Sequence, residues 1–380
     1  MKISSGITII FYFQNIFLSL VFAQIPRSGS DSLPQWMVFT TRNSKIPGNR
    51  ITAITQDPNE LLFFSFGGKI WAFNGTKWKN YYKPPSWSGE DDIKKMVFDN
   101  TGVMWAVGTN NRTAFYEDEH WSELNQKNSP LPDGKVTDMA IDLNNIKWFT
   151  TSGDGLIRYD GNAFILMDTM CDVPDTNFIS VAIDRNNIFW LLSSAGLVKF
   201  SNDSVFELSE NFKNPELPGK INFFGIGSDN RIWMCGGNNF SVRGGGIAVF
   251  DGLTTFRYSR QNSSLTSDCV NSIAWDNNGT LWAGNCNCSG RDVITGTKIF
   301  YRGGVARPLE PVTMSVNISF MQFINASGNA LNTLPGLRSE EENRTLARNV
   351  NVIFVDKDNN KWIGTDNGLF VYNEKGVVVK

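Results

Sequence analysis

The sequence predicts an all-β protein, a seven-bladed β-propeller of four-stranded blades whose ring is closed by an N-terminal strand. Three observations predict this fold. An Asp followed six residues later by a Trp, or by a close variant of this pair, recurs along the 380 residues at intervals of 42 to 47 with one interval of 80. Each well-formed unit holds four short stretches typical of β-strands, and the two chain ends together supply one more unit. A repeat of about 40 to 45 residues with four strands is the length of a propeller blade.

The repeated Asp and Trp mark the hairpin between the first two strands of each unit. We expect the Asp to cap the turn by accepting backbone N–H groups, and the Trp to pack between neighbouring sheets. The pairs are Asp99/Trp105, Asp142/Trp148, Asp184/Trp190, Asp276/Trp282 and Asp356/Trp362, with Asp57/Phe63 as an aromatic variant and Asp229/Trp233 as a variant two residues shorter.

One unit shows all four strands. Residues 136–142 and 146–151 are the first two, and the Gly-bearing turn 152–155 leads to the third at 156–160. Residues 162–167 make the fourth, so the unit reads as one complete antiparallel blade.

The chain ends are expected to share one blade. Residues 36–41, "WMVFTT", look like an outermost strand without partners, and residues 350–372 look like three strands without a fourth. Joining them in one sheet removes the open edges of the ring. The C-terminal "KGVVVK" competes for the same outer place. The extra residues after Asp276 are divided into two blocks, each too short for a blade, so we predict seven blades with eight as the alternative.

Two segments, "VNVIFVDKDNNKWIGTDNGLFVYN" (350–373) and "VTDMAIDLNNIKWFTTSGDGLIRYDG" (136–161), resemble the repeats of the two-component regulator propeller family. The resemblance extends over 36–380, with the units from Asp57 and Asp229 degraded. In that family such propellers commonly form the periplasmic sensing half of bacterial hybrid histidine kinases, and others are secreted alone. The resemblance therefore implies an exported, sensor-type propeller, which we expect to stand alone without kinase activity.

The N-terminus predicts export. Lys2 precedes a largely apolar stretch at 7–22, and small residues at Val21 and Ala23 fit a cleavage site before Gln24. We expect a signal peptide at 1–23, a linker at 24–35 and the propeller at 36–380, with a loop and short-helix insertion around 312–348. An uncleaved anchor is the alternative for the first segment. The mature chain is then secreted or periplasmic, without stable membrane insertion, and we expect a monomer.

Composition limits the possible partners. The chain is 41 % hydrophobic and 19 % charged, with a net charge of −2 and no run of Lys or Arg. Nucleic acid is therefore not an expected partner, because phosphate binding needs a basic face.

Catalytic and metal motifs are scarce. The one His, His120, falls on the predicted outermost strand of its unit, and no nucleophile elbow, H-E-x-x-H pair or phosphate-binding Gly loop occurs. The Asp-rich turns at 276–280 and 356–360 lack the Gly and Glu of an EF-hand loop, so a capped turn is the better interpretation. We predict no metal site and no cofactor.

Five cysteines leave at least one thiol without an intramolecular partner. If 276–279 is the hairpin turn, Trp275 opposes Thr280, and stepping outward places Cys269 opposite Cys286. The sequence therefore predicts a disulfide between Cys269 and Cys286 in an oxidising compartment.

The longest predicted loops fall on one face of the ring, which carries the connections between the second and third strands and the links between blades. We expect a raised rim there that binds the ligand, with Trp87 in the link 84–92 across the ring as an aromatic platform. The other candidate ligand-binding residues are Asn238, Asn239, Arg243, Asn285, Asn287, Arg291 and Asp292.

Two functions from different classes follow. The first is a non-catalytic binding, sensing or protein-interaction module for a glycan, a peptide or a partner protein. The alternative is an enzyme at the channel mouth, a lyase or carbohydrate-active enzyme that uses carboxylates and a divalent metal. The scarcity of His favours the first, since streptogramin lyases, which resemble this architecture, are expected to need a His base.

Overall fold

The structure, a computed structural model, describes most of the chain from Leu33 onward. The described residues are 33–34, 36–87, 91–131, 135–167, 177–193, 196–200, 221–227, 230–237, 245–259, 262, 268–285, 293–298, 349–379 and short strands between 301 and 331. They belong to one compact unit, Ser32–Lys380. The predicted signal peptide, most of the linker and the predicted short helix at 339–348 lie outside the described residues.

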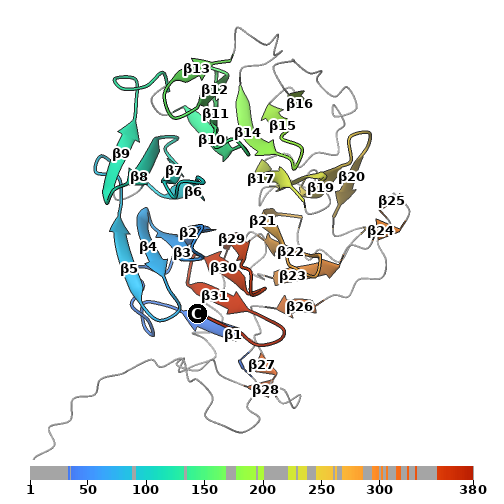
Figure 1. Cartoon of the computed structure of the whole chain (residues 1–380). Helices are drawn as coiled ribbons and strands as arrows, with labels where there is room; N and C mark the ends of the chain where they lie inside the picture. Colours follow the sequence, from blue (N-terminus) through green and yellow to red (C-terminus); the bar gives the residue numbers. More distant parts are fainter. Residues whose placement is uncertain are drawn as a thin grey trace, which may run out of the picture. The chain divides into compact units, whose positions relative to one another are not determined.

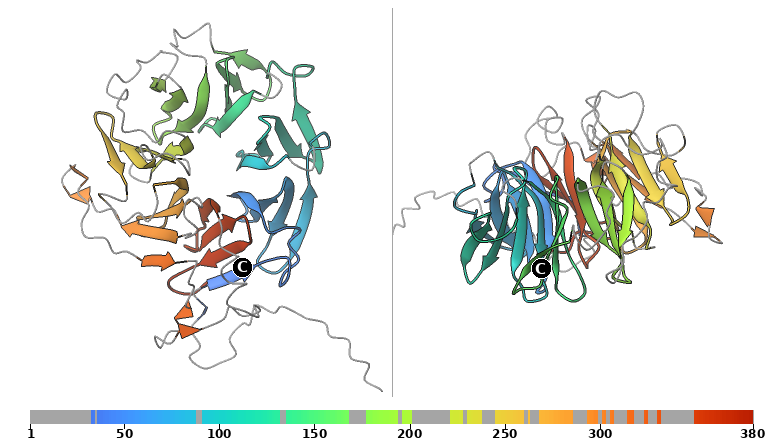
Figure 2. Two further views of the ribbon diagram at one scale, coloured as in Figure 1. Left: turned by 180° about the vertical axis from the view of Figure 1, so that it is seen from behind. Right: turned by 90° about the horizontal axis from the view of Figure 1, so that it is seen from above.

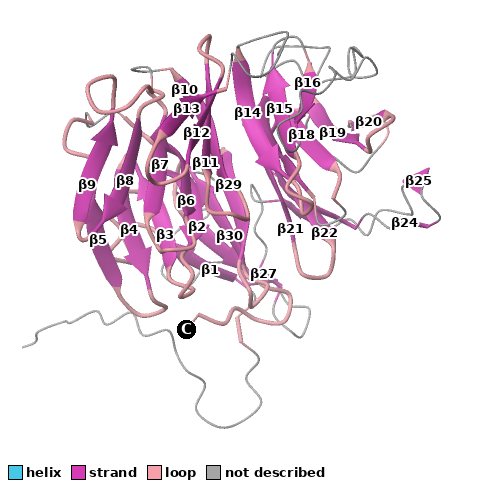
Figure 3. Ribbon diagram, turned by 45° about the horizontal axis from the view of Figure 1, so that its top comes forward, coloured by secondary structure: helices cyan, strands magenta, loops and turns pink. Residues whose placement is uncertain are grey.

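All the regular elements of the described residues are strands (Figure 3). Following the chain after β1, one sheet holds β2 (Ile51–Gln56), β3 (Leu62–Phe66), β4 (Lys69–Phe73) and β5 (Trp78–Tyr82). The next sheet holds β6 (Ile93–Phe98), β7 (Met104–Gly108), β8 (Thr113–Glu117) and β9 (His120–Leu124). There follow β10 (Val136–Ile141), β11 (Lys147–Thr151), β12 (Leu156–Tyr159) and β13 (Phe164–Leu166), then β14 (Phe178–Ile183), β15 (Phe189–Ser193) and β16 (Leu197–Phe200). Further on come β17 (Ile221–Ile226), β18 (Ile232–Gly236), β19 (Gly246–Phe250) and β20 (Thr255–Tyr258), then β21 (Val270–Trp275), β22 (Thr280–Asn285), β23 (Val293–Lys298) and β26 (Met314–Asn317). The closing blade holds β1 (Trp36–Phe39), β29 (Val350–Val355), β30 (Lys361–Thr365) and β31 (Leu369–Tyr372). Two short pairs are β24 (Tyr301–Arg302) with β25 (Val305–Ala306), and β27 (Phe323–Ile324) with β28 (Ala330–Leu331).

The sheets are the blades of a β-propeller. Among the described residues, six sheets have four antiparallel strands, and β14, β15 and β16 make a three-stranded sheet. The first strand of each sheet touches the first strand of the next, from β2 through β6, β10, β14, β17, β21 and β29 back to β2. The sheets therefore surround a common axis, as the two opposite views show (Figures 1 and 2).

The two ends of the described chain share one blade, as predicted. Strand β1 is antiparallel to β31 and outermost in the order β1-β31-β30-β29, with Trp36 opposite Tyr372 and Phe39 opposite Leu369. The C-terminal segment does not take the outer place. It runs beside the blade, where Val377 N–H donates to the carbonyl of Pro34 at 2.8 Å.

The repeated Asp caps its turn and also binds its Trp. In Asp142, Oδ1 accepts the N–H groups of Asn144 and Ile146 at 2.8 and 2.9 Å, while Oδ2 accepts Nε1–H of Trp148 at 3.1 Å. The same indole bond recurs from Asp99 at 3.3 Å, from Asp276 at 3.0 Å and from Asp356 at 2.7 Å. Both oxygens of these carboxylates are thus committed to the fold, which confirms the capped-turn interpretation.

Each bound Trp lies against aromatic rings of the following blade. The ring of Trp148 is 4.5 Å from Phe189, and the ring of Trp282 is 5.5 Å from Tyr372. Orienting the indole through the Asp therefore also orients the contact between blades. The predicted position of the Trp between sheets is confirmed.

Buried lysines strengthen two of these blade contacts. Lys147 Nζ lies 2.8 Å from Oδ2 of Asp99 in the preceding blade, and its amine is 5.5 Å from the ring of Trp105. Lys361, fully buried, makes the equivalent contact with Asp276 at 3.5 Å. Burial opposes ionisation of Asp99, but hydrogen bonds from Lys147 and from its own turn outweigh that effect and lower its pKa.

Asparagines in the same turns make a further link between blades. Asn145, Asn187, Asn230 and Asn359 all have positive φ, which Asn tolerates better than most residues. The side-chain oxygen of each accepts a backbone N–H from the preceding blade, for example Asn359 from Asn277 at 2.8 Å. The contact between blades β2–β5 and β6–β9 lacks this bond. Gly102 occupies the Asn position in the second of these blades, and Pro58, which has no N–H, occupies the donor position in the first.

In the unit predicted from Asp229, the first hairpin begins two residues earlier than predicted. Gly227 N–H donates to the carbonyl of Arg231 at 2.8 Å, as the Asp does in the other turns, and Ile226 pairs with Ile232. Gly227 therefore takes the capping position, six residues before Trp233 as elsewhere. The prediction of a turn two residues shorter is wrong, because it followed the Asp and not the spacing.

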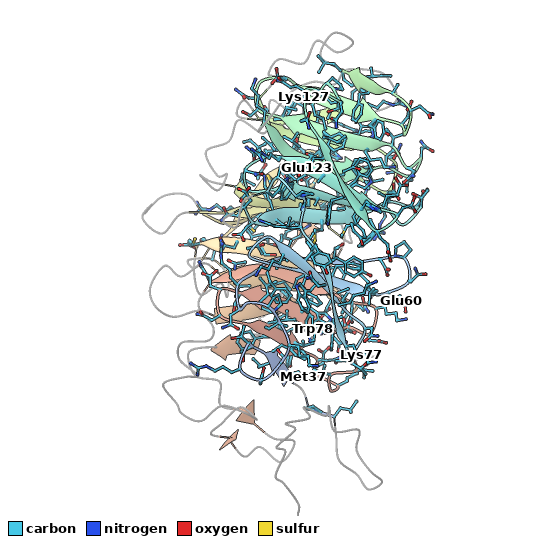
Figure 4. The ribbon with its side chains drawn as sticks, turned by 90° about the vertical axis from the view of Figure 1, so that its left-hand side faces the viewer. Met37, Glu60, Lys77, Trp78, Glu123 and Lys127 are labelled. Atoms are coloured by element: carbon cyan, nitrogen blue, oxygen red, sulfur yellow. The ribbon has the colours of Figure 1, made fainter. Side chains whose placement is uncertain are left out.

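The two faces of the ring have different turns. We call the side with the Asp-capped turns and the turns between third and fourth strands the hairpin face; in blade β2–β5 it holds 57–61 and 74–77. Figure 4 shows Glu60 and Lys77, one from each turn, at the same side of the molecule. The opposite side, the link face, holds the turns between second and third strands and the links between blades, here Arg50, Gly67–Gly68 and Tyr82.

Candidate functional site

Every innermost strand carries a β-bulge at its second residue. The pairing with the second strand skips one residue directly after the first residue of β2, β6, β10, β14, β17, β21 and β29. The bulged residues are Thr52, Lys94, Thr137, Ile179, Asn222, Asn271 and Asn351. Bulges redirect a side chain out of the regular alternation, and here they do so at one level around the ring axis, near the link face.

Most of the bulged side chains reach the next blade around the ring. Asn351 Nδ2 donates to the carbonyl of Ile51 at 3.0 Å, and Asn271 Nδ2 donates to that of Val350 at 3.1 Å. Asn222, Thr137 and Lys94 donate in the same way to Val270, Phe178 and Thr137. The mouth of the ring at this face is therefore lined by polar groups that also connect the blades.

An ion pair with a hydroxyl lies one residue further along. Lys95 Nζ is 2.8 Å from Oδ1 of Asp138, and Ser180 Oγ–H and Val181 N–H both donate to Oδ2. Burial opposes ionisation of Asp138, but the charge of Lys95 and the hydrogen bonds from Lys95 and Ser180 outweigh it and lower the pKa of Asp138. This group joins three neighbouring blades, and its polar atoms are occupied.

A second charged cluster stands at the entrance of the same mouth. Arg50, directly before β2, pairs with Asp92, directly before β6, and its Nε is 3.4 Å from Oδ1 of Asp366 in the turn between β30 and β31. Asn349 and Asn351 each donate to Asp366, at 3.0 and 2.9 Å. Asp92 is buried, but 56 % of the Arg50 side chain is exposed and 33 % of Asp366. Groups from three blades are thus held in place with donors and acceptors still open to solvent.

Trp87 does not form the predicted platform. Its side chain is 2 % exposed and belongs to the apolar core between blades β2–β5 and β6–β9. The link folds back because Trp87 N–H donates to the carbonyl of Pro84 at 3.1 Å, and the ring lies so close to Gly108 that an added Cβ there would be 2.9 Å from it. A buried ring cannot stack on a ligand, so this prediction is wrong.

The other candidate residues belong to two connections between strands that are described only at their ends. Asn238, Asn239, Arg243, Asn287, Arg291 and Asp292 lie outside the described residues, and Asn285 ends β22 with its side chain also outside them. The connections that carry them do join second and third strands, from β18 to β19 and from β22 to β23.

The hairpin face holds a cavity of about 250 Å³ at the seam between the closing blade and blade β2–β5. Leu62, Phe73 and Trp362 form its apolar part, and Asn59 and Asn74 are among its polar lining. Two of its lining side chains, Glu60 and Lys357, pair with each other, and the carboxylate of Asp356 already caps its turn. Most of its charge is therefore engaged in joining the two blades.

The one His of the chain lies at the outer edge of its blade. His120 begins β9, the outermost strand of its sheet, and is exposed, as predicted. Within the described residues, no three His, Cys, Asp or Glu side chains gather as a metal site, and no helix is long and apolar enough to cross a membrane.

The hairpin β21–β22 differs from the predicted register. Trp275 pairs with Leu281, one residue later than expected, and the bulge at Asn271 restores the difference, so that Val270 pairs with Asn285. Cys269 is disulfide-bonded. Its predicted partner Cys286 lies outside the described residues, while Cys235 is a buried free thiol.

Sequence reasoning missed Arg50, Asp92 and Asp366, the residues that structure the mouth. A signal was present in the sequence: a charged or amide residue stands directly before several innermost strands. The bulges that bring these positions to the mouth have no recognisable residue signature, since Thr, Lys, Ile and Asn all occupy them.

The Asp138 ion pair predicts a pH-dependent stability. Because its folded pKa lies below the unfolded value of 3.8, ionised Asp138 stabilises the fold above that pH, and the contribution is lost as the pH falls through the folded pKa. Asp138→Asn should lower the unfolding free energy at pH 7 by about 2 kcal/mol and flatten its fall below the unfolded pKa of 3.8. Thermal unfolding at pH 7 and at a series of pH values below 3.8 measures both effects.

The matched control is Asp154→Asn, because the Asp154–Lys135 pair is also 2.8 Å apart but has side chains 41 and 49 % exposed. We expect it to change stability by less than about 1 kcal/mol. Equal effects of the two substitutions would contradict the role given to Asp138.

Comparison with known proteins gives one family and many solved structures. Residues 264–287 match the family described as two component regulator propeller. These residues hold the first hairpin of blade β21–β26. No curated protein matches the chain.

Two similar structures come from B. thetaiotaomicron. The extracellular domain of the putative hybrid two component system BT3049 is 18 % identical, with 90 % of this chain and 42 % of that one covered and a TM-score of 0.60. The extracellular domain of the putative one component system BT4673 is 14 % identical, with 89 and 40 % covered and a TM-score of 0.58. This chain thus spans about two-fifths of these structures.

A third similar structure is virginiamycin B lyase from Staphylococcus aureus, at 12 % identity, with 88 % of this chain and 98 % of that one covered and a TM-score of 0.59. At such identities the three likenesses show the fold alone.

Proposed function

We propose that this chain, a two-component regulator propeller, acts as a non-catalytic exported module that binds a ligand, senses it or docks a partner protein. The observation that carries the proposal is the cluster of Arg50, Asp92 and Asp366 at the link-face mouth. Three blades hold these groups in place, and the exposed guanidinium still offers donors outward. Such convergent and pre-oriented polar groups are typical of ligand sites.

The ligand classes are a small glycan, a peptide or a surface loop of a partner protein. The raised rim predicted from Asn238 to Arg243 and from Asn285 to Asp292 remains part of this proposal, without Trp87. The extracellular assignment of the two B. thetaiotaomicron domains supports an exported chain, secreted or periplasmic, with the signal peptide at 1–23.

The enzyme alternative is less well supported. His120, the one His of the chain, is on an outermost strand. The most buried carboxylates near the axis and in the turns are occupied by Lys, Trp and backbone donors. A carboxylate that already accepts such bonds is a poor general base.

We infer seven blades. The three-stranded sheet β14–β16 counts as the seventh. The cycle of contacts between the seven first strands supports this count.

We also infer that Cys286 is the partner of Cys269, since Val270 pairs with Asn285 at the adjacent position. Peptide mapping of exported protein without reduction should find one peptide pair joined through these two residues. A bond from Cys269 to Cys171 or Cys288 would overturn the pairing.

The proposed function is tested by presenting the purified chain to a glycan array and a peptide array, followed by mass spectrometry of each bound ligand after incubation. We expect at least one specific ligand, recovered unchanged. Its conversion to a new product would contradict the non-catalytic assignment, and the absence of any binding would contradict the binding function.

A further inference from the structure

Tyr82 is an exposed aromatic residue in an unfavourable backbone conformation. It ends β5 with φ = 59°, and 72 % of it is exposed. A bulky residue with positive φ is a conformational outlier that lowers stability, and such outliers gather at binding sites. Because its side chain is largely exposed, packing does not explain why Tyr82 adopts this conformation.

The neighbouring Tyr81 shows what packing does explain. A bulge in the pairing of β4 with β5 sets Ile70 opposite Tyr82 and Trp71 opposite Asn80, so Tyr81 is the extra residue. The Tyr81 ring is 4.9 Å from Phe63, inside the interface with the next blade. The same bulge leaves Tyr82 exposed, with its N–H held by Oδ1 of Asn80 at 2.7 Å.

Tyr82 and the Arg50 cluster lie at the link-face ends of the same blade. We call the link-face ends of β2 to β5 the row. It begins at Arg50, which precedes β2, and continues through Phe66 and Lys69, which pair with each other. It ends at Tyr82, which pairs with Ile70. Three strand spacings of about 4.8 Å separate β2 from β5, so the row is about 14 Å long. It runs from the mouth of the ring to its outer edge.

The turn between β3 and β4, which lies between Arg50 and Tyr82 along the row, carries no side chains. Gly67 and Gly68 form it with φ of 55° and 77°, and a Cβ on Gly68 would lie 2.1 Å from the carbonyl oxygen of Asp91. Any other residue at Gly68 would clash as well as being strained, so the turn stays low. Backbone is therefore all that this turn presents between Arg50 and Tyr82.

The charges along the row select a neutral ligand. Arg50 and exposed Lys69 are matched by Asp92 and Asp366, with half-buried Asp91 beside them, so no excess of positive charge attracts an anion. A hydroxyl group can accept from the guanidinium and donate to Asp366 together, which neither a carboxylate nor an ammonium group can do. A sugar ring offers such hydroxyls on its edge and C–H groups on its face for an aromatic ring.

We propose that the row from Arg50 over Gly67–Gly68 to Tyr82 is a subsite for a short neutral oligosaccharide, with one sugar at the Arg50–Asp366 pair and another stacked on Tyr82. This subsite rests on the proposed binding function and names its ligand class. The site is distinct from the rim predicted from the long loops.

The test measures binding of neutral trisaccharides (maltotriose, cellotriose, mannotriose and xylotriose) to the full chain by calorimetry, with trigalacturonate and trialanine as charged and peptide probes. Tyr82→Asn removes the ring and suits positive φ, so it should not lower the melting temperature. We expect it to weaken binding of the preferred neutral probe about tenfold, and Tyr82→Phe, which keeps the ring, to change it by less than about twofold. The matched control is Leu253→Asn, which alters a residue 74 % exposed on the hairpin face.

Three outcomes overturn the subsite: no neutral probe binds, trigalacturonate or trialanine binds better than every neutral probe, or Tyr82→Asn leaves affinity unchanged. If a ligand found on the arrays binds the wild type and the Tyr82→Asn variant equally, the subsite fails while the binding function stands. If neither arrays nor trisaccharides yield a ligand, both fail.

Discussion

The bond between an Asp carboxylate and the indole N–H of the Trp six residues later is the interaction on which the rest of the structure depends. One oxygen holds the turn and the other holds the ring, so a single side chain fixes both a hairpin and the orientation of the largest residue in the sheet. That residue is the contact with the next blade. The bond is present in the blades of Asp99, Asp142, Asp276 and Asp356, where it orients the contact with the next blade, and β1 completes the closing sheet as its outermost strand.

The two faces of the ring differ in how many of their polar side chains are engaged in the fold. On the hairpin face, the Asp oxygens, the Asn side chains at positive φ and the buried amines of Lys147 and Lys361 are engaged within the turns or between blades. On the link face, the bulged side chains also join blades, but Arg50, Asp366 and Tyr82 stay largely or partly open to solvent. Both faces therefore join the blades, but the exposed polar and aromatic groups named here lie on the link face.

The sequence predicted the parts that repeat. The Asp–Trp spacing, the strands of unit 136–167 and the shared blade of the chain ends all follow from local patterns that recur, and the structure has them. It failed where one position departs from the pattern, as at Gly227, where the spacing persists but the Asp does not. The prediction that Trp87 is an exposed platform was wrong for another reason. A Trp in a polar link suggests an exposed ring, and only the turn from Pro84 and the close approach to Gly108 show that the ring is buried. The mouth was missed although charged or amide residues stand before several innermost strands, because the bulges that bring these positions together depend on strand pairing and have no residue signature.

The most direct test of this division is amide hydrogen exchange of the full chain with and without the tightest ligand from the arrays. The account predicts that bound ligand slows exchange in the peptides covering Arg50–Thr52, Gly67–Lys69 and Asp366–Gly368, and leaves the turns at 57–61 and 356–360 unchanged. Protection confined to those hairpin-face turns would contradict it.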